Sequence, residues 1–322
     1  MRSHLSGALL GYAADVLFGD PRRGHPVAVF GSFATRLERR LWRDDRAAGA
    51  LFTAVCAGGA ALTAAAAHGA LRARPLPHAA LTAAATWAVL GGTSLAREAE
   101  AVGAALAAGD LDAARERLPH LCGRDPRALD ADGIARAVVE SVAENTSDAV
   151  VGALVWGAAA GVPGLVGFRA VNTLDAMVGH RSPRHLRFGW SAARLDDVAG
   201  WPGARLSALL AVALGPDRAG AVRAWREDAG RHPSPNAGVV EAAFAGALGV
   251  RLGGTLSYGG RVEHRPVLNP AGRAVEVADI NRAVRLSRRV GALALAVTLA
   301  GRVAATSVRG ARTRKAGGRG VV

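Results

Sequence analysis

Two long uncharged segments, separated by a short polar turn, dominate the first third of the chain. Residues 49–71 and residues 76–96 carry no formal charge, and each is long enough to cross a bilayer, which needs about 20 residues. Arg72, Arg74 and Pro75 lie between them. We therefore expect two transmembrane helices joined by a tight turn, with the Arg-rich segments before and after them on one face of the membrane, the cytoplasmic face. A buried, alanine-rich helix pair in a soluble enzyme is the alternative.

The apolar segments further along the chain are interrupted. Residues 149–168 are uncharged, but the Gly-Val-Pro-Gly sequence at 161–164 should end or kink a helix. If this segment crossed the bilayer completely, the polar motifs on its two sides would lie about 30 Å apart. We therefore predict that it turns back, or folds into a membrane-embedded pocket. Residues 206–214 are too short to span alone, and an arginine interrupts residues 290–305.

These patterns predict an all-α fold, namely a polytopic integral membrane protein with broken or re-entrant helices. Residues 1–306 would form a single membrane-embedded helical domain. Residues 307–322 are rich in glycine and arginine, so we expect a basic, disordered tail there. The apolar run near the N-terminus lacks a small-residue cleavage site, and we do not read it as a signal peptide.

The composition excludes several classes of chemistry. The 322 residues are 50% hydrophobic and 20% charged, with a net charge of +14 that comes almost entirely from arginine. The single lysine, Lys315, lies near the C-terminus, which excludes an internal Schiff base, a pyridoxal-phosphate anchor and a GxxxxGK[ST] phosphate loop. The arginines are scattered among acidic residues without a nucleic-acid-binding signature, so we expect no nucleic acid partner. Two cysteines are too few for a disulfide framework.

One predicted helix carries a polar stripe that runs directly into an apolar segment. The helix should begin at Asp132, as its cap, and end near residue 147. Four charged side chains recur every four residues along it, with an asparagine beside them: Arg136, Glu140, Glu144, Asp148 and Asn145. A solvated stripe with an Arg–Glu pair is the ordinary interpretation. Carboxylates next to a membrane-depth segment are costly, however, unless they bind a cation such as Mg²⁺.

Further polar groups follow at intervals suited to a binding site. Arg169, Asn172 and Asp175 fall at helical spacing, so one helix face would present a cation, an amide and a carboxylate. The turn before the predicted helix 239–248 has the sequence Pro-Ser-Pro-Asn-Ala-Gly, and helix N-termini of this kind accept anionic groups. The other members of the series are the cations Arg181 and Arg194, the paired aspartates Asp196 and Asp197, and the N-terminal turn with Asp20 and His25. A lone histidine such as His25 is more often structural than catalytic.

Several sequence blocks, in order, resemble the CobD/CbiB family of membrane-bound adenosylcobinamide-phosphate synthases. They are VESVAENTSD at 139–148, the run FRAVNTLDAMVGH from residue 168, SPNAG at 234–238, DVLFGDPRRGHPV at 15–27 and GALGVRLGG at 246–254. The resemblance extends over about residues 11–289. Small departures include Asn269, which stands where a glycine is usual.

The resemblance implies an enzyme of cobalamin biosynthesis, a carbon–nitrogen ligase. Such an enzyme joins (adenosyl)cobyric acid to aminopropanol or aminopropanol phosphate, with ATP and Mg²⁺, to give cobinamide or its phosphate. It implies a multi-pass protein of the cell membrane whose active site faces the cytoplasm. Its partners would be the corrinoid, the amine and membrane lipid, together with other cobalamin-assembly enzymes. The form of the amine stays open.

The chemistry of such a ligation suggests a role for each candidate residue. A carboxylate must first be activated as an acyl phosphate or acyl adenylate, which calls for metal and cations around the phosphates. Without lysine, arginines would meet the phosphate charge. We expect Mg²⁺ at Glu144, Asp148, Asp196 and Asp197, and proton removal by Asp175 or Glu140. Substrate and ATP would be bound by Asn145, Arg169, Asn172, Arg181, Arg194, Ser234 and Asn236.

Two other classes of protein fit part of the pattern. A non-enzymatic membrane regulator related to the β-lactamase regulatory family would have dispensable carboxylates and would bind no corrinoid. A transporter would also have helices broken by glycine and proline, but few of the segments look like full spans.

Overall fold

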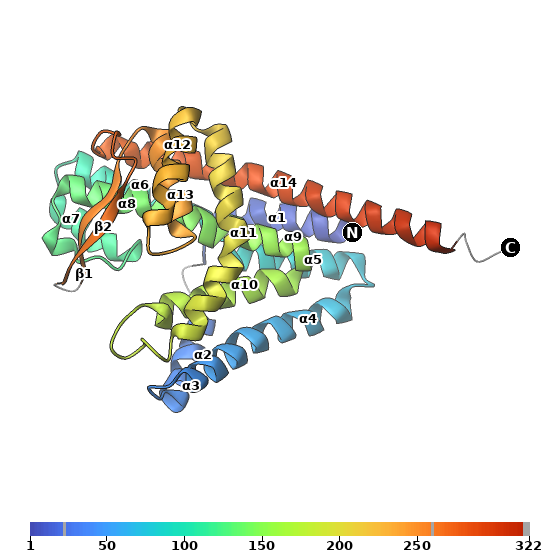
Figure 1. Ribbon diagram of the computed structural model, residues 1–322. Helices are drawn as coiled ribbons and strands as arrows, with labels where there is room; N and C mark the ends of the chain where they lie inside the picture. Colours follow the sequence, from blue (N-terminus) through green and yellow to red (C-terminus); the bar gives the residue numbers. More distant parts are fainter. Residues whose placement is uncertain (22–23, 259–260, 318–322) are drawn as a thin grey trace.

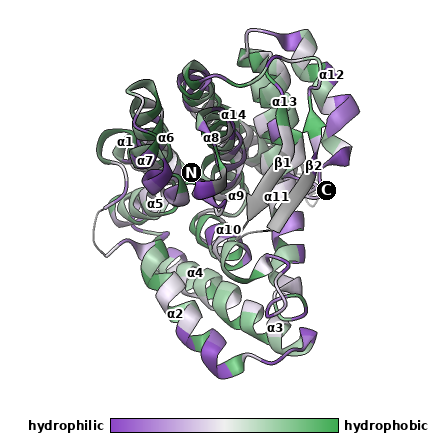
Figure 2. Cartoon of the chain, turned by 90° about the vertical axis from the view of Figure 1, so that its left-hand side faces the viewer, coloured by the Kyte–Doolittle hydropathy of each residue, from purple (hydrophilic) through white to green (hydrophobic). Residues whose placement is uncertain are grey.

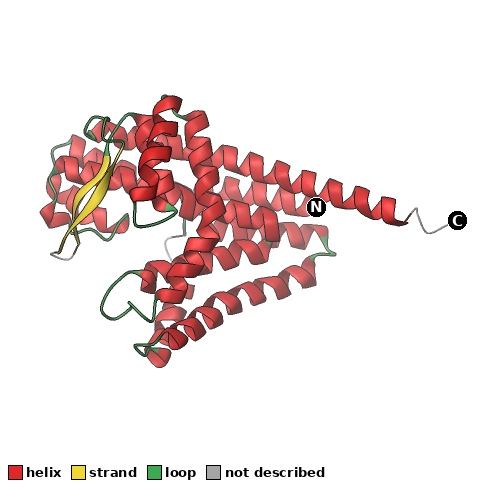
Figure 3. Cartoon of the chain, in the orientation of Figure 1, coloured by secondary structure: helices red, strands yellow, loops and turns green. Residues whose placement is uncertain are grey.

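The computed structural model describes residues 1–21, 24–258 and 261–317. Long helices run side by side, and one β-hairpin lies at the end opposite the C-terminus (Figures 1 and 3). The first half contains α1 (Arg2–Phe18), α2 (Pro26–Leu41), α3 (Arg46–Thr53), the π-helix η1 (Ala54–Gly58), α4 (Gly59–Leu71), α5 (Pro75–Val89), α6 (Gly92–Ala107), α7 (Leu111–Arg117), and the 3-10 turns η2 (Leu118–His120) and η3 (Pro126–Ala128). The second half contains α8 (Ala131–Thr146), the π-helix η4 (Ser147–Val151), α9 (Gly152–Ala160), α10 (Val162–Leu174), the π-helix η5 (Asp175–Gly179), α11 (Trp190–Leu214), α12 (Arg218–Asp228), the 3-10 turn η6 (Ala229–Arg231), α13 (Ala237–Leu248), β1 (Leu252–Tyr258), β2 (Arg261–Leu268) and α14 (Val277–Gly317).

Three helical segments among the described residues are long and apolar enough to cross a membrane. They are Arg46–Leu71, Pro75–Ala107 and Val277–Val308, and only 28%, 33% and 28% of their apolar windows are buried inside the protein. Because most of each window is uncovered, lipid is the surrounding that fits these surfaces. Hydropathy colouring shows the same division, with apolar helices such as α4 and hydrophilic stretches at α12 and the C-terminal end of α2 (Figure 2). The predicted membrane fold is confirmed.

The predicted turn between the first two spans is confirmed, whereas the second span is not one regular helix. α4 ends at Leu71 and α5 begins at Pro75. α5 then ends at Val89, Leu90 is extended, and α6 begins at Gly92. At this break the backbone N–H of Gly91 donates to the carbonyl oxygen of Ala149 at 3.3 Å. The break therefore ties the second span to the beginning of the segment that the sequence marked as re-entrant.

That segment turns back at the predicted place. Gly161 has φ 71°, a left-handed conformation that glycine adopts without steric cost, and it separates α9 from α10. A methyl group on Gly164 would overlap the carbonyl oxygen of Trp156, so the two helices pack at very close range. Because α9 and α10 form a hairpin, Asp148 before it and Asp175 after it lie at the same end.

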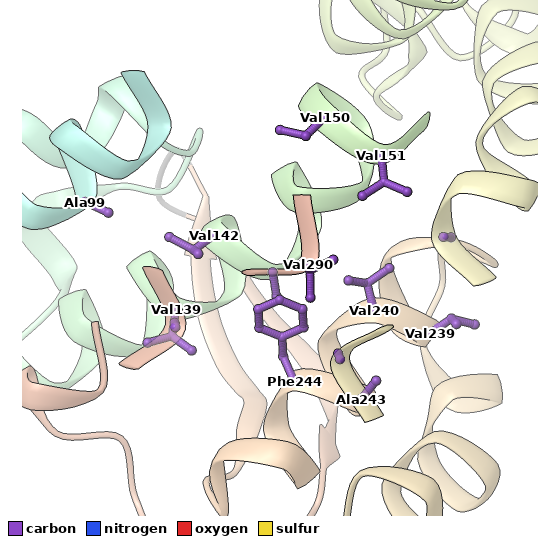
Figure 4. Close-up of a cluster of buried hydrophobic side chains, with 14 of the residues drawn as sticks. Ala99, Val139, Val142, Val150, Val151, Val239, Val240, Ala243, Phe244 and Val290 are labelled. Carbon is purple, nitrogen blue, oxygen red and sulfur yellow. The ribbon is translucent and has the colours of Figure 1, made fainter. Parts of the chain in front are cut away.

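α8 begins two residues before the predicted position. Asp130 caps it, because its carboxylate accepts a hydrogen bond from the backbone N–H of Gly133 at 2.8 Å. Asp132 lies in the first turn instead, where a negative charge favours the helix dipole. One side of α8 packs against α13 and α14 around Phe244, with Val139 and Val142 (Figure 4). This core fixes the direction in which the polar stripe of α8 points.

The last helix is longer than expected. α14 continues to Gly317, so the predicted boundary after residue 306 falls inside a helix. Residues 318–322 lie outside the described residues. The division into a domain and a tail stays a prediction, but residues 307–317 are helical, which the Gly/Arg composition alone did not indicate.

The β-hairpin is an addition to the predicted all-helical fold. β1 and β2 pair antiparallel, with an irregularity between Leu252 and Gly254. Gly253 has φ 81°, and a side chain there would strike the carbonyl oxygen of Pro266. After the hairpin, Asn269 adopts φ 52° and its side-chain amide donates to the carbonyl oxygen of Val250 at 2.9 Å. Asparagine tolerates this left-handed conformation better than most residues, which explains why it can replace a glycine.

Candidate active site

Five carboxylates from three separate segments come together where the helix hairpin opens. Glu144 lies near the end of α8 and Asp148 in η4, Asp175 begins η5, and Asp196 and Asp197 lie on the first turns of α11. Each of them interacts electrostatically with at least one other member of this group. We refer to these five residues as the acidic cluster. The prediction that the ENTSD and NTLD blocks share one site agrees with this arrangement.

Asp148 is the member whose charge is least favourable. Burial is the first cause that raises its pKa well above the ordinary value for aspartate. The negative charges of Asp196, Glu144 and Asp175 raise the pKa further, in that order. The guanidinium of Arg169 acts in the opposite direction. A cation bound beside Asp148 would remove much of this cost, which fits a metal site.

Asp175 and Asp196 are perturbed in the same direction. Burial raises the pKa of Asp175 to about 6, and the charges of Asp197 and Glu144 add to the effect. Burial also raises the pKa of Asp196 to about 7, with a further contribution from Asp175. Carboxylates that titrate close to neutral pH are suited to accept and release protons.

Glu144 shows that the cluster lines a recess. Its side chain is accessible to solvent, yet the surrounding protein raises its pKa by burial, against the charges of Arg265 and Arg124. A group that is both accessible and surrounded lies in a concave surface rather than on a convex one. The cluster is therefore open to a ligand from solution.

The predicted face of α10 points toward this recess. Asn172 donates through Nδ2 to Asp196 Oδ1 at 3.4 Å. Arg169 interacts with both Asp20 and Asp148, although burial lowers the pKa of its guanidinium. The structure thus brings Arg169, Asn172 and Asp175 to the acidic cluster, as their helical spacing predicts.

Other predicted residues lie at the rim or are already occupied. Arg194 is exposed and pairs with Asp197 at 3.1 Å. Arg181 is exposed on the loop after η5. Asn145 donates to the carbonyl oxygen of Ser141 at 3.0 Å, along its own helix. These residues are close in sequence to residues of the acidic cluster. The hydrogen bond of Asn145 is made within its own helix and is structural.

The SPNAG turn supports the site instead of presenting free donors to an anion. The hydroxyl of Ser234 accepts from the backbone N–H of Ala237 at 3.1 Å, so the start of α13 is already capped. Asn236 donates to the carbonyl oxygen of Asp197 at 2.8 Å and accepts from Arg205 at 2.6 Å. Its side chain therefore joins α13 to the turn of α11 that carries Asp196, which is a positioning contact.

Glu140 does not fit the predicted role of a base. It forms a buried ion pair with Arg124, and its second oxygen accepts from the backbone N–H of Gly253 at 2.7 Å. Both oxygens are occupied, and the side chain is buried. The helical stripe correctly places Glu140 and Glu144 on one face, but Arg124 and the hairpin enclose the first of them.

Sequence reasoning missed a second buried carboxylate beside Glu140. Glu241, on α13, has a pKa raised well above the usual range by burial, and next by the charges of Glu140 and Glu144. His232 Nε2 lies 3.9 Å from Glu241 Oε1. The signal was available, because Glu241 is the only charged residue in the apolar stretch Ala237–Leu248.

The four expected metal ligands are not preformed as a cage. Among the described residues, no group of three or more His, Cys, Asp or Glu side chains has an arrangement that could hold a metal ion. Mg²⁺ needs only one or two protein carboxylates, because water and phosphate oxygens complete its octahedron. Asp148 and Asp196 fit as such a pair, whereas Asp197 is tied to Arg194.

Comparison with known proteins gives a consistent result. The family model described as CobD/Cbib protein matches residues 8–287. The chain is 56% identical over 300 residues to the cobalamin biosynthesis protein CobD of Mycobacterium tuberculosis, which covers 91% of this chain and 95% of that protein. It is 44% identical over 291 residues to the protein of the same name from Chromobacterium violaceum, covering 89% and 93%. With Rhodobacter capsulatus CobD the identity is 41% over 272 residues, covering 83% and 86%.

No solved structure matches the chain. The matched region contains every block on which the resemblance was based. The chain belongs to the CobD/CbiB family of cobalamin biosynthesis, the adenosylcobinamide-phosphate synthases.

Proposed function

We propose that the acidic cluster is the place where a side-chain carboxylate of the corrinoid is activated and joined to the amine of aminopropanol or its phosphate. The observation that carries this proposal is the convergence of Asp148, Asp175 and Asp196 beside Arg169. Structural carboxylates are normally paired or solvated, whereas these raise one another's pKa. Such mutual repulsion is typical of sites that are completed by a cationic ligand.

Mg²⁺ and ATP fit the residues that are present. Asp148 and Asp196 would hold the metal, and Arg169 would neutralise phosphate oxygens, since its planar guanidinium suits that geometry. ATP, when bound with Mg²⁺, would supply the phosphoryl group for an acyl phosphate or the adenylyl group for an acyl adenylate. Asn172 would keep Asp196 in orientation through the hydrogen bond between them.

Asp175 is the residue we assign as proton acceptor for the attacking amine. An ammonium group cannot attack a carbonyl carbon until it has lost a proton. A carboxylate whose pKa is raised to about 6 by burial and by Asp197 is a better base than an ordinary aspartate. Asp175 also lies at the cluster, unlike Glu140, which is enclosed by its ion pair.

We propose that the acidic cluster faces the cytoplasm, where ATP is available. The Arg-rich region around α2 and α3 lies at this end, which agrees with the positive-inside rule. The turn with Arg72 and Arg74 and the C-terminal end of α14 lie at the opposite end (Figure 1). Since that end also carries arginines, labelling of single cysteines placed in the two regions is the measurement that decides the orientation.

The test is a ligation assay with purified protein in detergent, adenosylcobyric acid, each form of the amine, ATP and Mg²⁺. Asp148→Asn and Asp196→Asn should each lower the rate by about 100-fold, the upper end of the range for changes around a bound metal. Asp112→Asn, the same change on the exposed surface of α7, is the matched control. Near-wild-type rates in both cluster variants would refute the assignment.

A further inference from the structure

An open cleft of about 680 Å³ lies between α2 and the α10–η5 segment, next to the acidic cluster. Arg169 is shared, because it lines the cleft and interacts with Asp148. The other polar side chains that line the cleft include Asp20, His25, Thr35 and Thr173. None of the roles assigned so far uses the Asp20 turn, although the sequence placed two ionisable residues there directly after an apolar helix.

His25 lies beside the carboxylate of Asp20. The ring nitrogen Nδ1 of His25 accepts a hydrogen bond from the backbone N–H of Val27 at 3.1 Å. The neutral ring must then carry its proton on Nε2, which lies 3.4 Å from Asp20 Oδ1. On the other side, the backbone N–H of Asp20 donates to the hydroxyl of Ser94 at 3.1 Å. The backbone of Asp20 is thus fixed by Ser94, and its carboxylate lies beside His25 at the edge of the cleft.

Asp20 also lies close to the segment that carries Asp148. A methyl group on Gly91 would lie 4.0 Å from Asp20 Oδ2 and 3.8 Å from the Cβ atom of Ala149. Gly91 therefore separates the carboxylate from the residue that follows Asp148. A ligand group held by Asp20 would therefore lie near the segment that carries Asp148.

The carboxylate of Asp20 shares a cation with the acidic cluster. The guanidinium of Arg169 interacts with both Asp20 and Asp148, so it serves two carboxylates. Asp15 interacts with Asp20 and with Arg97. Asp20 Oδ1 is enclosed and makes no hydrogen bond among the described residues. The rest of the Asp20 side chain is accessible from the cleft, and a primary ammonium group there would supply a positive charge and hydrogen-bond donors for the carboxylate.

We infer that this cleft binds the amine cosubstrate, with Asp20 holding its primary ammonium group and His25 acting as a positioning residue for Asp20. The inference rests on the proposed function. It assigns the N-terminal Gly-Asp-Pro turn to acceptor binding, whereas the ENTSD and NTLD blocks serve activation of the corrinoid. Free aminopropanol and its phosphate share the ammonium group, so both are used in the test.

Hydroxylamine separates the two halves of the reaction. It is uncharged near neutral pH and traps activated carboxyl groups as hydroxamates, so it needs no ammonium-binding residue. For each variant we compare the rate of amide formation with the rate of hydroxamate formation from the same corrinoid and ATP. The ratio of the two rates does not depend on how much of the protein is folded.

Asp20→Asn should lower kcat/KM for the amine by about 10- to 100-fold, the effect of losing one charged hydrogen bond. Hydroxamate formation should stay unchanged. His25→Ala should raise KM for the amine with little change in kcat, which a merely structural role would not produce. Asp44→Asn, an acidic residue on the exposed surface after α2, is the control for the charge change.

Several results would overturn the inference. An unchanged ratio in Asp20→Asn, whether both rates are kept or both are lost, contradicts a role in amine binding. If Asp20→Asn does not fold, an unchanged amine KM in His25→Ala has the same meaning. Absence of any hydroxamate with the wild-type protein would instead refute the proposed function. With both amines compared, a loss confined to aminopropanol phosphate would show that the cleft recognises the phosphate rather than the ammonium group, and would also overturn the inference.

Discussion

Replacing Asp196 by asparagine should make the folded protein more stable above neutral pH while it removes activity. Burial raises the pKa of Asp196 from 3.8 to about 7, and the charge of Asp175 adds to this. The folded state therefore disfavours the ionised side chain more than the unfolded state does. Asparagine has nearly the same shape, keeps an oxygen that can accept the hydrogen bond from Asn172, and carries no charge.

The sign of the effect follows from the direction of the pKa shift. A carboxyl group whose pKa is higher in the folded state contributes stability that is fully present below its unfolded pKa of 3.8. This stability is lost as the pH rises through about 7, the folded value. Near pH 4 the wild-type protein and Asp196→Asn should therefore melt at similar temperatures, and they should diverge up to pH 8.

The size of the effect can be bounded. A shift of about 3 pKa units corresponds to about 4 kcal/mol at full ionisation, since one unit is 1.36 kcal/mol. Water reaches the half-buried side chain and screens part of this, so we expect about 1–3 kcal/mol. For a chain of this length, 1 kcal/mol shifts the melting temperature by about 2 °C, which gives a gain of about 2–6 °C at pH 8.

The assay is thermal unfolding of the purified protein in detergent at pH 4 and pH 8, without added metal. Asp112→Asn on α7 serves as the control, because Asp112 is exposed and pairs only with its neighbour Arg115 among the described residues. A melting temperature of Asp196→Asn that does not exceed that of the wild type at pH 8 would refute the reasoning. A gain of equal size at both pH values would refute it as well, because the effect would then not come from ionisation.

Three further predictions follow from the same geometry. In a pH–rate profile, kcat/KM for the amine should fall about tenfold per pH unit below pH 6, because Asp175 must be ionised to accept a proton and burial raises its pKa to about 6. Arg124→Met should lower the free energy of unfolding by about 3–5 kcal/mol in chemical denaturation, since Glu140 would be left buried and charged, and a second change, Glu140→Gln, should restore most of it. Gly164→Ala should lower both activity and melting temperature, because its methyl group overlaps α9, whereas Gly167→Ala on the same helix should be tolerated at its 3.4 Å contact.

Helix-breaking residues in the sequence made the helical framework predictable. Glycine and proline at 161–164 marked the turn between α9 and α10, and the Arg-Pro turn at 72–75 marked the connection of two spans. The break at Leu90 was not predicted, although the Gly91-Gly92 pair that follows it disfavours a helix locally. It depends on a backbone contact between Gly91 and Ala149, which lie far apart in the sequence.

The sequence predicted which residues lie at the candidate site better than it predicted the groups to which they are hydrogen-bonded. Helical spacing placed Glu140 and Glu144 on one face of α8, and both do lie there. The spacing could not show that Arg124, from an irregular segment, and the backbone N–H of Gly253, from the hairpin, would bond to the two oxygens of Glu140. Glu144 is left facing the recess. Ser234 illustrates the same limit, since its hydroxyl caps α13 and is not offered to a ligand.

Two of the π-helical turns, η4 and η5, carry Asp148 and Asp175, one directly before and one directly after the α9–α10 hairpin. A π-turn accommodates one more residue than the regular spiral, and such insertions are found mostly where function repays their weaker bonding. Deleting one residue from either turn would remove the wide turn and change the placement of the side chains in it, so the carboxylate would move relative to its partners. The length of these two turns is therefore as constrained as the identity of the aspartates themselves.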